Sequence, residues 1–593
     1  MKMKKILALL TAGAMLTGML TGCGGDEGSS GSSQGGGDAQ EESTGGDAAG
    51  DDAAGGEEAG GDEAEGGDEA GGSQAEASKD PITFKYYNAD GKNGNWSETA
   101  VGAAITEATG VTLEVSYPVS STGDPSEDIS LMIAEDNYPD LIYSKASVTN
   151  LYEAGALVDM TDLIEQYGPN IKKMYGDEFE KLKWGSGDEG IYQLSYAGVR
   201  GQIFSTGGTC QIQYAVLKEN DYKYPTTLAE YEAMIKSYLE AHPTTEDGLE
   251  TIGITMSASD WHWMITLGNP AGFIADAAPD NGQWLIDENY NCTYKHSSDD
   301  EKEYFRWLSR MYDEGILDPN FATQTDDDYI AKLASGRVVA ITDANWHYLQ
   351  AHAALKAENK LDKTYCGLPV TMNADDKAPT LMYQGLQVGY GLAITKSCED
   401  PVRAIQFLDY LCSDEGAILY RWGIEGEHYF LDENGKRYRT PEEIAKAQSD
   451  PDYSKTTGIG NYTGFPIYGD GVLDDNGDYM TPSSRESVIA EYNEEEKAAC
   501  DAWGVEMLID IFPQPDEFET PPYSPLWAYA IPQELSNNVT ILDEIAFPGL
   551  VKCVTEPESS FDANWDAMIA ELEANGLEET NQMMTEFLAT KVN

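Results

Sequence analysis

Aromatic side chains in loops are the residues of this chain whose possible chemistry is clearest. A flat ring can cover the apolar CH face of a pyranose, and amide, carboxylate or guanidinium groups can bind its hydroxyls. Several rings follow apolar runs and therefore sit in loops after strands. The sequence predicts a carbohydrate site formed by the aromatic residues Trp96, Trp261, Trp263, Trp346, Tyr383 and Trp422, with Arg200, Asp343 and Asn345 as hydroxyl partners.

Core packing is the alternative role for each tryptophan, because protein interiors also contain large apolar rings. Position in the chain distinguishes the two roles. Trp96 follows an extended run and a polar loop, Trp261 follows the run 252–256, and Trp346 follows the apolar run 338–341. Loops that follow strands carry many binding residues, so we expect these three tryptophans in particular to reach a ligand.

Alternating strand and helix patterns precede these loops. The first extended run is rich in β-branched and aromatic residues, and helical patterns separate it from two further runs. Such alternation with short connections is typical of an α/β domain with a parallel sheet, whose ligands gather beyond the carboxyl ends of the strands. We expect strands at 82–87, 111–117, 140–143 and 386–394, and helices at 98–108 (N-cap Ser97), 126–135, 226–241, 300–314, 401–412, 564–574 and 580–589.

The composition limits the partners of this chain. It carries 104 acidic and 37 basic residues, a net charge of −67. Such a surface repels nucleic acid and anionic lipid headgroups, so neither is expected as a partner. Of the eight cysteines, those after Cys23 are widely spaced and form no CxxC pair. We therefore predict no cofactor, no metal and buried thiols, although disulfides remain open.

The N-terminus has the pattern of an export signal. Three lysines precede the apolar run 6–20, which is too short for a stable spanning helix. The following residues, Leu20-Thr21-Gly22-Cys23, resemble the lipobox of bacterial lipoproteins. The resemblance implies a signal peptide at 1–22 and a lipidated Cys23 that anchors the protein to the extracellular face of the bacterial cell membrane. An ordinary secretory signal is the alternative.

An acidic, glycine-rich segment follows the lipobox. Residues 24–78 contain no aromatic, branched aliphatic or basic side chain, so they cannot bury enough apolar surface to fold. We expect residues 23–80 to be a disordered linker that tethers the remaining chain. The remaining residues are too many for one simple core and predict two or three lobes.

Six segments share a pattern with a known family: NYPDLIY (137–143), AGALVDMTDLIEQYGPN (154–170), YPTTLAE (224–230), YDEGILDPNF (312–321), residues 389–416 and WGIEGEHY (422–429). Together they resemble the extracellular solute-binding proteins of carbohydrate ABC importers, LplA-like lipoproteins above all. The resemblance implies a type II periplasmic-binding-protein fold, with two α/β lobes, a hinge and a ligand cleft between the lobes. It also implies a monomer that captures an oligosaccharide and docks on ABC transporter permease subunits.

The order of these segments predicts approximate lobe boundaries. Lobe I would comprise residues 81–205 and 385–420, and lobe II residues 206–384 and 421–593. Some members of the family have a calcium loop before an equivalent of the strand at 252–255. Here residues 242–250 offer few carboxylates in that stretch, short of the alternating ligand set that calcium requires. We therefore expect no calcium in this loop.

Three other functions are compatible with parts of this pattern. A secreted glycoside hydrolase would also need an aromatic cleft and two carboxylates, but no catalytic motif points to one. A peptide-binding receptor on the same fold would need anchored charges for the termini of its ligand. A lipoprotein that senses or adheres without transport is the third. The resemblance favours binding without catalysis, so no enzyme activity is expected.

Overall fold

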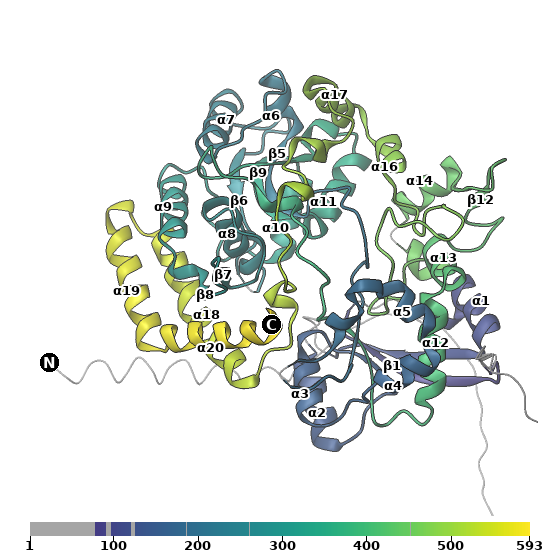
Figure 1. Ribbon diagram of the computed structural model, residues 1–593. Helices are drawn as coiled ribbons and strands as arrows, with labels where there is room; N and C mark the ends of the chain where they lie inside the picture. The colour runs from purple at the N-terminus through teal and green to yellow at the C-terminus, as the bar shows by residue number, and fades with distance from the viewer. Residues whose placement is uncertain are drawn as a thin grey trace, which may run out of the picture. The chain divides into compact units, whose positions relative to one another are not determined.

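The computed structural model describes residues 78–90, 96–119, 125–185, 187–259, 261–450 and 452–592 (Figure 1). The predicted signal peptide, Cys23 and nearly all of the predicted linker lie outside the described residues, as does most of the polar loop before Trp96. In the described part of the chain, no helix is both long and apolar enough to cross a bilayer.

The first sheet has five strands in the order β2-β1-β3-β11-β4. Strands β1 (Ile82–Asn88), β2 (Val111–Ser116) and β3 (Leu141–Tyr143) are parallel, as predicted. Strand β11 (Gly391–Ile394) is antiparallel to both β3 and β4 (Leu194–Ser195). The sheet is therefore mixed, because the chain enters β11 from the opposite end after crossing from the second sheet.

The second sheet has four strands in the order β10-β5-β9-β6. Strands β6 (Ile252–Thr255) and β9 (Val338–Ala344) are parallel. Strand β5 (Gly208–Gln213) is antiparallel to both β9 and β10 (Tyr365–Leu368). Two short antiparallel pairs, β7–β8 (Trp284–Ile286, Cys292–Tyr294) and β12–β13 (Phe430–Leu431, Arg437–Tyr438), lie outside the two main sheets.

The predicted helices are present, and two of them, α2 (Ser126–Glu135) and α12 (Pro401–Cys412), have the predicted bounds. Helix α1 begins at Ala100 because Thr99, and not Ser97, is its N-cap: the Thr99 hydroxyl accepts the Gly102 N–H at 3.0 Å. The other predicted helices appear as α1 (Ala100–Thr109), α7 (Leu228–Ala241), α9 (Asp299–Asp313), α19 (Phe561–Ala574) and α20 (Leu577–Val592).

Further helices surround the two sheets (Figure 1). With the first sheet lie α3 (Val148–Glu153), α4 (Thr161–Tyr167), α5 (Pro169–Tyr175) and α13 (Asp414–Trp422). The remaining helices are α6 (Tyr214–Glu219), α8 (Asn269–Ala275), α10 (Asp326–Ala334), α11 (Asn345–Ala357), α14 (Pro441–Ser449), α15 (Tyr453–Thr457), α16 (Arg485–Glu491), α17 (Glu494–Trp503) and α18 (Gln533–Thr555).

Each main sheet has its own apolar core. The segment 453–480, which we expected in lobe II, packs in the core of the first sheet instead. Its Phe465 ring meets Tyr86 edge to face, with ring centroids 5.0 Å apart. This segment has no periodic hydrophobic pattern, so sequence alone does not show which core its aromatic side chains join. The C-terminal helices α18, α19 and α20 join the core of the second sheet.

The chain crosses between the two cores after β4, after β10 and again between residues 480 and 499. A small apolar cluster contains Leu381 and Met507, and the partly buried residues Phe204 and Val488 pack against it. These side chains come from, or directly follow, the three crossing segments. The cluster is thus placed where a hinge between two lobes must lie.

Gly198, Gly201 and Gly469 allow two backbone segments of the first lobe, the lobe built on the first sheet, to touch. The Val199 N–H donates to the Ile467 carbonyl, and the Gly469 N–H donates to the Val199 carbonyl, each at 3.0 Å. A Cβ atom on Gly469 would lie 2.1 Å from the Cα of Gly201. No side chain fits between these backbones.

We therefore expect Gly469→Ala to lower the free energy of unfolding by about 2 kcal/mol, the usual effect of overpacking. Urea unfolding followed by tryptophan fluorescence measures the change. Gly207→Ala is the matched control, because a Cβ atom there meets nothing within 4 Å. Equal stability of the two variants would contradict the close contact at Gly469.

Candidate functional site

A cavity of about 610 Å³ is lined by both lobes and by the C-terminal helices. Tyr196 and Tyr390 line it from the first lobe, and Trp261 and Trp346 from the second. Residues from Leu526 to Met584 complete the wall, including several side chains of α18. The cavity is therefore built from three regions that lie far apart in the sequence.

Trp261 and Trp346 give this cavity an exposed aromatic wall. Trp261 is 48% exposed and Trp346 is 52% exposed, and both are predicted site residues. The two rings are nearly parallel, at 13°, with centroids 6.3 Å apart. Trp346 is the second residue of α11, directly after β9, so the predicted position after a strand is confirmed.

Stacked rings support this wall from behind. His262 stacks on Trp261 with ring centroids 4.0 Å apart, and His347 stacks on His262 at 4.7 Å and 12°. Tyr329, whose ring is fully buried, stacks on the other side of His347 at 5.3 Å. The exposed tryptophans thus rest on a column that reaches the core of the lobe.

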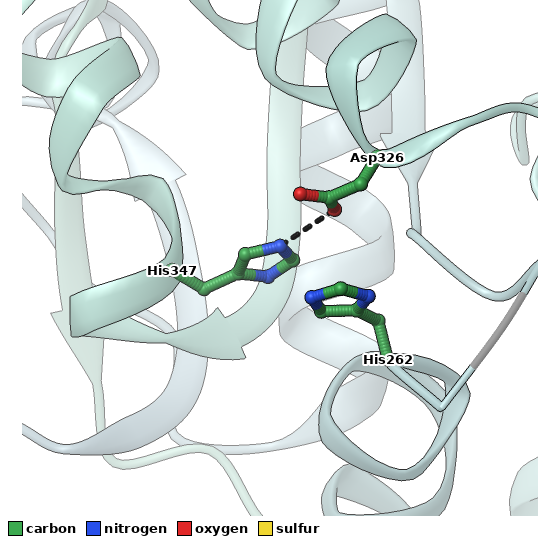
Figure 2. A group of neighbouring side chains, drawn as sticks. All are labelled: His262, Asp326 and His347. Carbon is green, nitrogen blue, oxygen red and sulfur yellow. Dashed lines mark hydrogen bonds and ion pairs between the residues drawn. The ribbon is translucent and has the colours of Figure 1, made fainter. Parts of the chain in front are cut away.

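Two carboxylates hold the imidazole of His347. Its Nε2 lies 2.7 Å from Asp326 Oδ1, and its Nδ1 lies 3.0 Å from Asp343 Oδ1 (Figure 2 draws the bond to Asp326). A ring that donates to a carboxylate from both nitrogens is an imidazolium. Burial alone lowers the pKa of His347, but the two hydrogen-bonded carboxylates outweigh it and raise that pKa to about 9.

Other hydrogen-bond donors also bind the carboxylates of Asp343 and Asp326. Asp343 accepts the Tyr329 hydroxyl and the Ala344 N–H, each at 2.7 Å, and its burial raises its pKa. Asp326 accepts the Ser257 hydroxyl at 2.7 Å. Burial acts to raise the pKa of Asp326, but the hydrogen bonds from His347 and Ser257 and the neighbouring imidazole charges together outweigh it and lower that pKa. Asp343 is only 1% exposed, so it supports the wall and does not reach the cavity as a hydroxyl partner.

His262, Asp326 and His347 are also the described residues that could hold a metal ion, with donor atoms within 4.8 Å of one another (Figure 2). A metal lies in the plane of each imidazole that coordinates it, and these two rings are stacked, not convergent. Asp326 moreover already occupies His347 Nε2. The arrangement suits a hydrogen-bonded ion pair better than a metal centre.

The other predicted tryptophans are buried away from this cavity. Trp96 is fully buried in the core of the first sheet, where its indole N–H donates to the Tyr117 hydroxyl at 3.0 Å. Trp263 is 6% exposed and stacks on Phe547. Trp422 packs near Arg437 and donates to the Tyr479 carbonyl. For these three, the alternative of core packing describes the observed positions.

The three remaining predicted residues also lie outside the described lining of the cavity. Tyr383 is half-exposed, and its pKa is raised, chiefly by burial and then by Glu178. Asn345 donates to the Ser205 hydroxyl at 3.3 Å. Arg200 is exposed with a φ of 60°. Asn345 is the first residue of α11, whereas Arg200 and Tyr383 lie outside the helices and strands.

Sequence reasoning missed the polar end of the cavity. Lys295 begins a short 3-10 turn after β8, and Asp280 lies in a loop. Only the arrangement of α8, the β7–β8 pair and α18 brings them to one cavity. One residue on the first-lobe side, Tyr390, has a positive φ of 53°, which a single sequence does not reveal. The missed lining residues include Asn269, Asp280, Gln283, Lys295, Asp543, Tyr196, Tyr390 and Trp527.

Comparisons with known proteins agree with this architecture. Among solved structures, the alginate-binding protein AlgQ2 without calcium ion has a TM-score of 0.60 at 16% identity, covering 86% of this chain and 98% of its own. An HMO-binding, ABC-transporter-associated solute-binding protein from Bifidobacterium longum infantis has a TM-score of 0.62 at 15% identity, covering 86% and 99%. These likenesses confirm the predicted two-lobed α/β fold.

Curated relatives are similar over shorter stretches. Lipoprotein LipO of Bacillus subtilis (strain 168) is 20% identical over 350 residues, which cover 55% of this chain and 63% of LipO. The chain spans between about half and two thirds of the length of the curated relatives it matches. The model of the bacterial extracellular solute-binding proteins matches residues 100–423, more than half of the chain. The chain belongs to the family of bacterial extracellular solute-binding proteins.

Proposed function

We propose that this protein captures an oligosaccharide outside the cell and delivers it to the permease of an ABC transporter. The observation that carries the proposal is the pair Trp261 and Trp346, two nearly parallel, half-exposed rings on the wall of a cavity. Exposing two large rings to water is unfavourable unless a ligand covers them. A sugar ring supplies the CH face that suits them.

Other features support a glycan as the ligand. The cavity volume of about 610 Å³ is within the ordinary range for small-molecule sites. Amide and charged side chains at one end can bind hydroxyls, and solved structures of the same fold carry alginate-binding and HMO-binding names. The protein would act by binding alone, without breaking a glycosidic bond.

Side chains of both lobes line the cavity, so a bound glycan would contact both. Asn150 and Tyr390 would meet it from one side, and Trp346 from the other. A ligand that binds the closed form more tightly shifts the population toward that form. We infer that the closed, loaded monomer is what the permease recognises.

We further propose that acylated Cys23 anchors the protein outside the cell membrane. The lipobox and the similarity to Lipoprotein LipO support this anchor. Residues 24–78 would then tether the lobes and keep them concentrated near the permease, which raises local concentration without any added contact.

Trp261→Ala and Trp346→Ala should each weaken glycan binding by about 2 kcal/mol, roughly 30-fold, as for a buried aromatic anchor. A thermal-shift screen of oligosaccharides identifies a ligand, and isothermal titration calorimetry measures its affinity. Leu349→Ala is the control, since this exposed residue of α11 is not among the described residues of the cavity wall. Unchanged affinity in both tryptophan variants, or cleavage of the bound glycan, would reject the proposal.

The His347 ion pair should make stability depend on pH. Its pKa of about 9 in the folded protein exceeds the ordinary 6.5, so its stabilisation is complete below about pH 6.5 and is lost as pH rises through 9. The gap in melting temperature between wild type and His347→Gln should therefore narrow from pH 7 to pH 10.

A second histidine of α11 provides the control for that measurement. Burial lowers the pKa of His352 to about 3, so this side chain is neutral throughout the range. Its Nε2 accepts the Tyr365 N–H at 2.7 Å. His352→Gln should give a gap in melting temperature that is constant between pH 7 and pH 10. Parallel curves for His347→Gln as well would contradict an imidazolium at His347.

Cys23→Ala should release the protein from the membrane fraction, because the acyl chains are its proposed anchor. Metabolic labelling with palmitate and detergent-phase partitioning measure the change. Ser29→Ala, in the same acidic segment, should stay labelled and membrane-bound. Undiminished labelling of Cys23→Ala would show that the lipid is attached elsewhere, and absence of label from the wild type would show that the protein carries none.

A further inference from the structure

One end of the cavity contains a lysine that is almost fully buried. Lys295 is 4% exposed, follows β8 and lines the cavity beside residues of α18. Its Nζ donates to Asn269 Oδ1 at 2.8 Å. Burial lowers the pKa of Lys295, and nearby carboxylates oppose this effect. The position is costly for an ammonium group, and such groups are ordinarily paired or bound to a ligand.

The ammonium of Lys295 has more donors than protein partners. An ammonium offers three N–H groups, and the hydrogen bond to Asn269 uses one of them. Within the described ranges, Lys295 makes no direct ion pair. Because the side chain lines the cavity, its remaining N–H groups are available to an acceptor on a ligand.

Asn269 links this lysine to an acceptor on the same wall. Its Oδ1 accepts from Lys295, while its Nδ2 donates to Asp280 Oδ2 at 3.3 Å. Asp280 also accepts the Gly282 N–H at 2.9 Å, which fixes the carboxylate. The indole N–H of Trp527 donates to the Asp280 carbonyl at 3.1 Å, so an aromatic ring stands beside the polar groups. A hydrogen-bond donor (Lys295), an acceptor (Asp280) and an aromatic ring (Trp527) thus occur together, as recognition of a sugar requires.

The charges around Lys295 disfavour an anionic ligand. Asp280 and Asp543 line the cavity with it, and Asp276 and Glu301 act on it from behind. Burial, and then the charge of Glu301, raise the pKa of Asp276 to about 7. The positive charge of Lys295 is therefore already balanced by the carboxylates around it. A ligand carboxylate would add to an excess of negative charge.

We propose that Lys295 and Asp280 form a subsite that selects an uncharged, hydroxyl-bearing sugar ring and disfavours a uronate. Lys295 donates to one ring hydroxyl and Asp280 accepts from another, while Trp527 covers the apolar face. This inference rests on the proposed function and adds the ligand class: a neutral oligosaccharide.

Matched trisaccharides that differ only at C6 test the selectivity: mannotriose against trimannuronate, galactotriose against trigalacturonate, and cellotriose against its C6-oxidised form. Calorimetry on the mature soluble chain should give at least tenfold tighter binding of the neutral member of any pair that binds. Lys295→Met should weaken the neutral member by tenfold or more. Lys302→Met, which removes a partly buried lysine outside the cavity, should leave affinity unchanged.

A second variant separates selectivity from folding. Asp280 is exposed, so Asp280→Asn should fold normally, and the loss of one negative charge should narrow the preference for the neutral member. Tighter binding of the uronate by wild type, or a preference that neither variant changes, would overturn the subsite while leaving glycan capture intact. If no member of any pair binds at millimolar concentration, glycan capture itself is rejected and the subsite with it.

Discussion

A buried positive charge between two carboxylates is the interaction on which the binding wall depends. His347 joins three elements, because Asp343 is the penultimate residue of β9, Asp326 begins α10 and His347 itself lies in the first turn of α11. The exposed tryptophans then rest on this ring and on His262. A charged group in the interior is costly alone but stable with both donors satisfied. The same contacts that satisfy the charge also fix the direction of the exposed aromatic rings.

Local signals in the sequence explain how much of the fold could be predicted. Helix α12 has Asp400 as its N-cap and Pro401 at its first position, and both signals are visible in the sequence. Trp346 could be placed because a strand immediately precedes it. Trp96 could not, because its burial depends on Phe465, a residue far along the chain in a segment without a periodic pattern. Lys295 carries no local signal at all; its role follows from the helices that bury it.

The apolar cluster at the crossing segments is one of several contacts between the two lobes: Tyr529 packs against both main cores, and Lys591 of α20 donates to the Trp184 carbonyl. The cluster that contains Leu381 and Met507 is small compared with either main core. A hinge made of a few side chains lets two rigid lobes change their relation without repacking either core. Under the proposed function, the free energy for closure would come from ligand contacts in the cavity, with side chains such as Tyr390 and Trp261 on opposite lobes.

The third wall of the cavity comes from the C-terminal part of the chain. Helix α18 supplies Val539 and Asp543, and α20 supplies Met584, after every strand of both main sheets has been completed (Figure 1). These helices also belong to the apolar core of the second sheet, so a change in their packing reaches the cavity wall directly. In evolution, recombination after residue 525 would exchange this wall as a block, from Leu526 to Met584. A lineage could thereby change the lining of the cavity while keeping every strand of both main sheets.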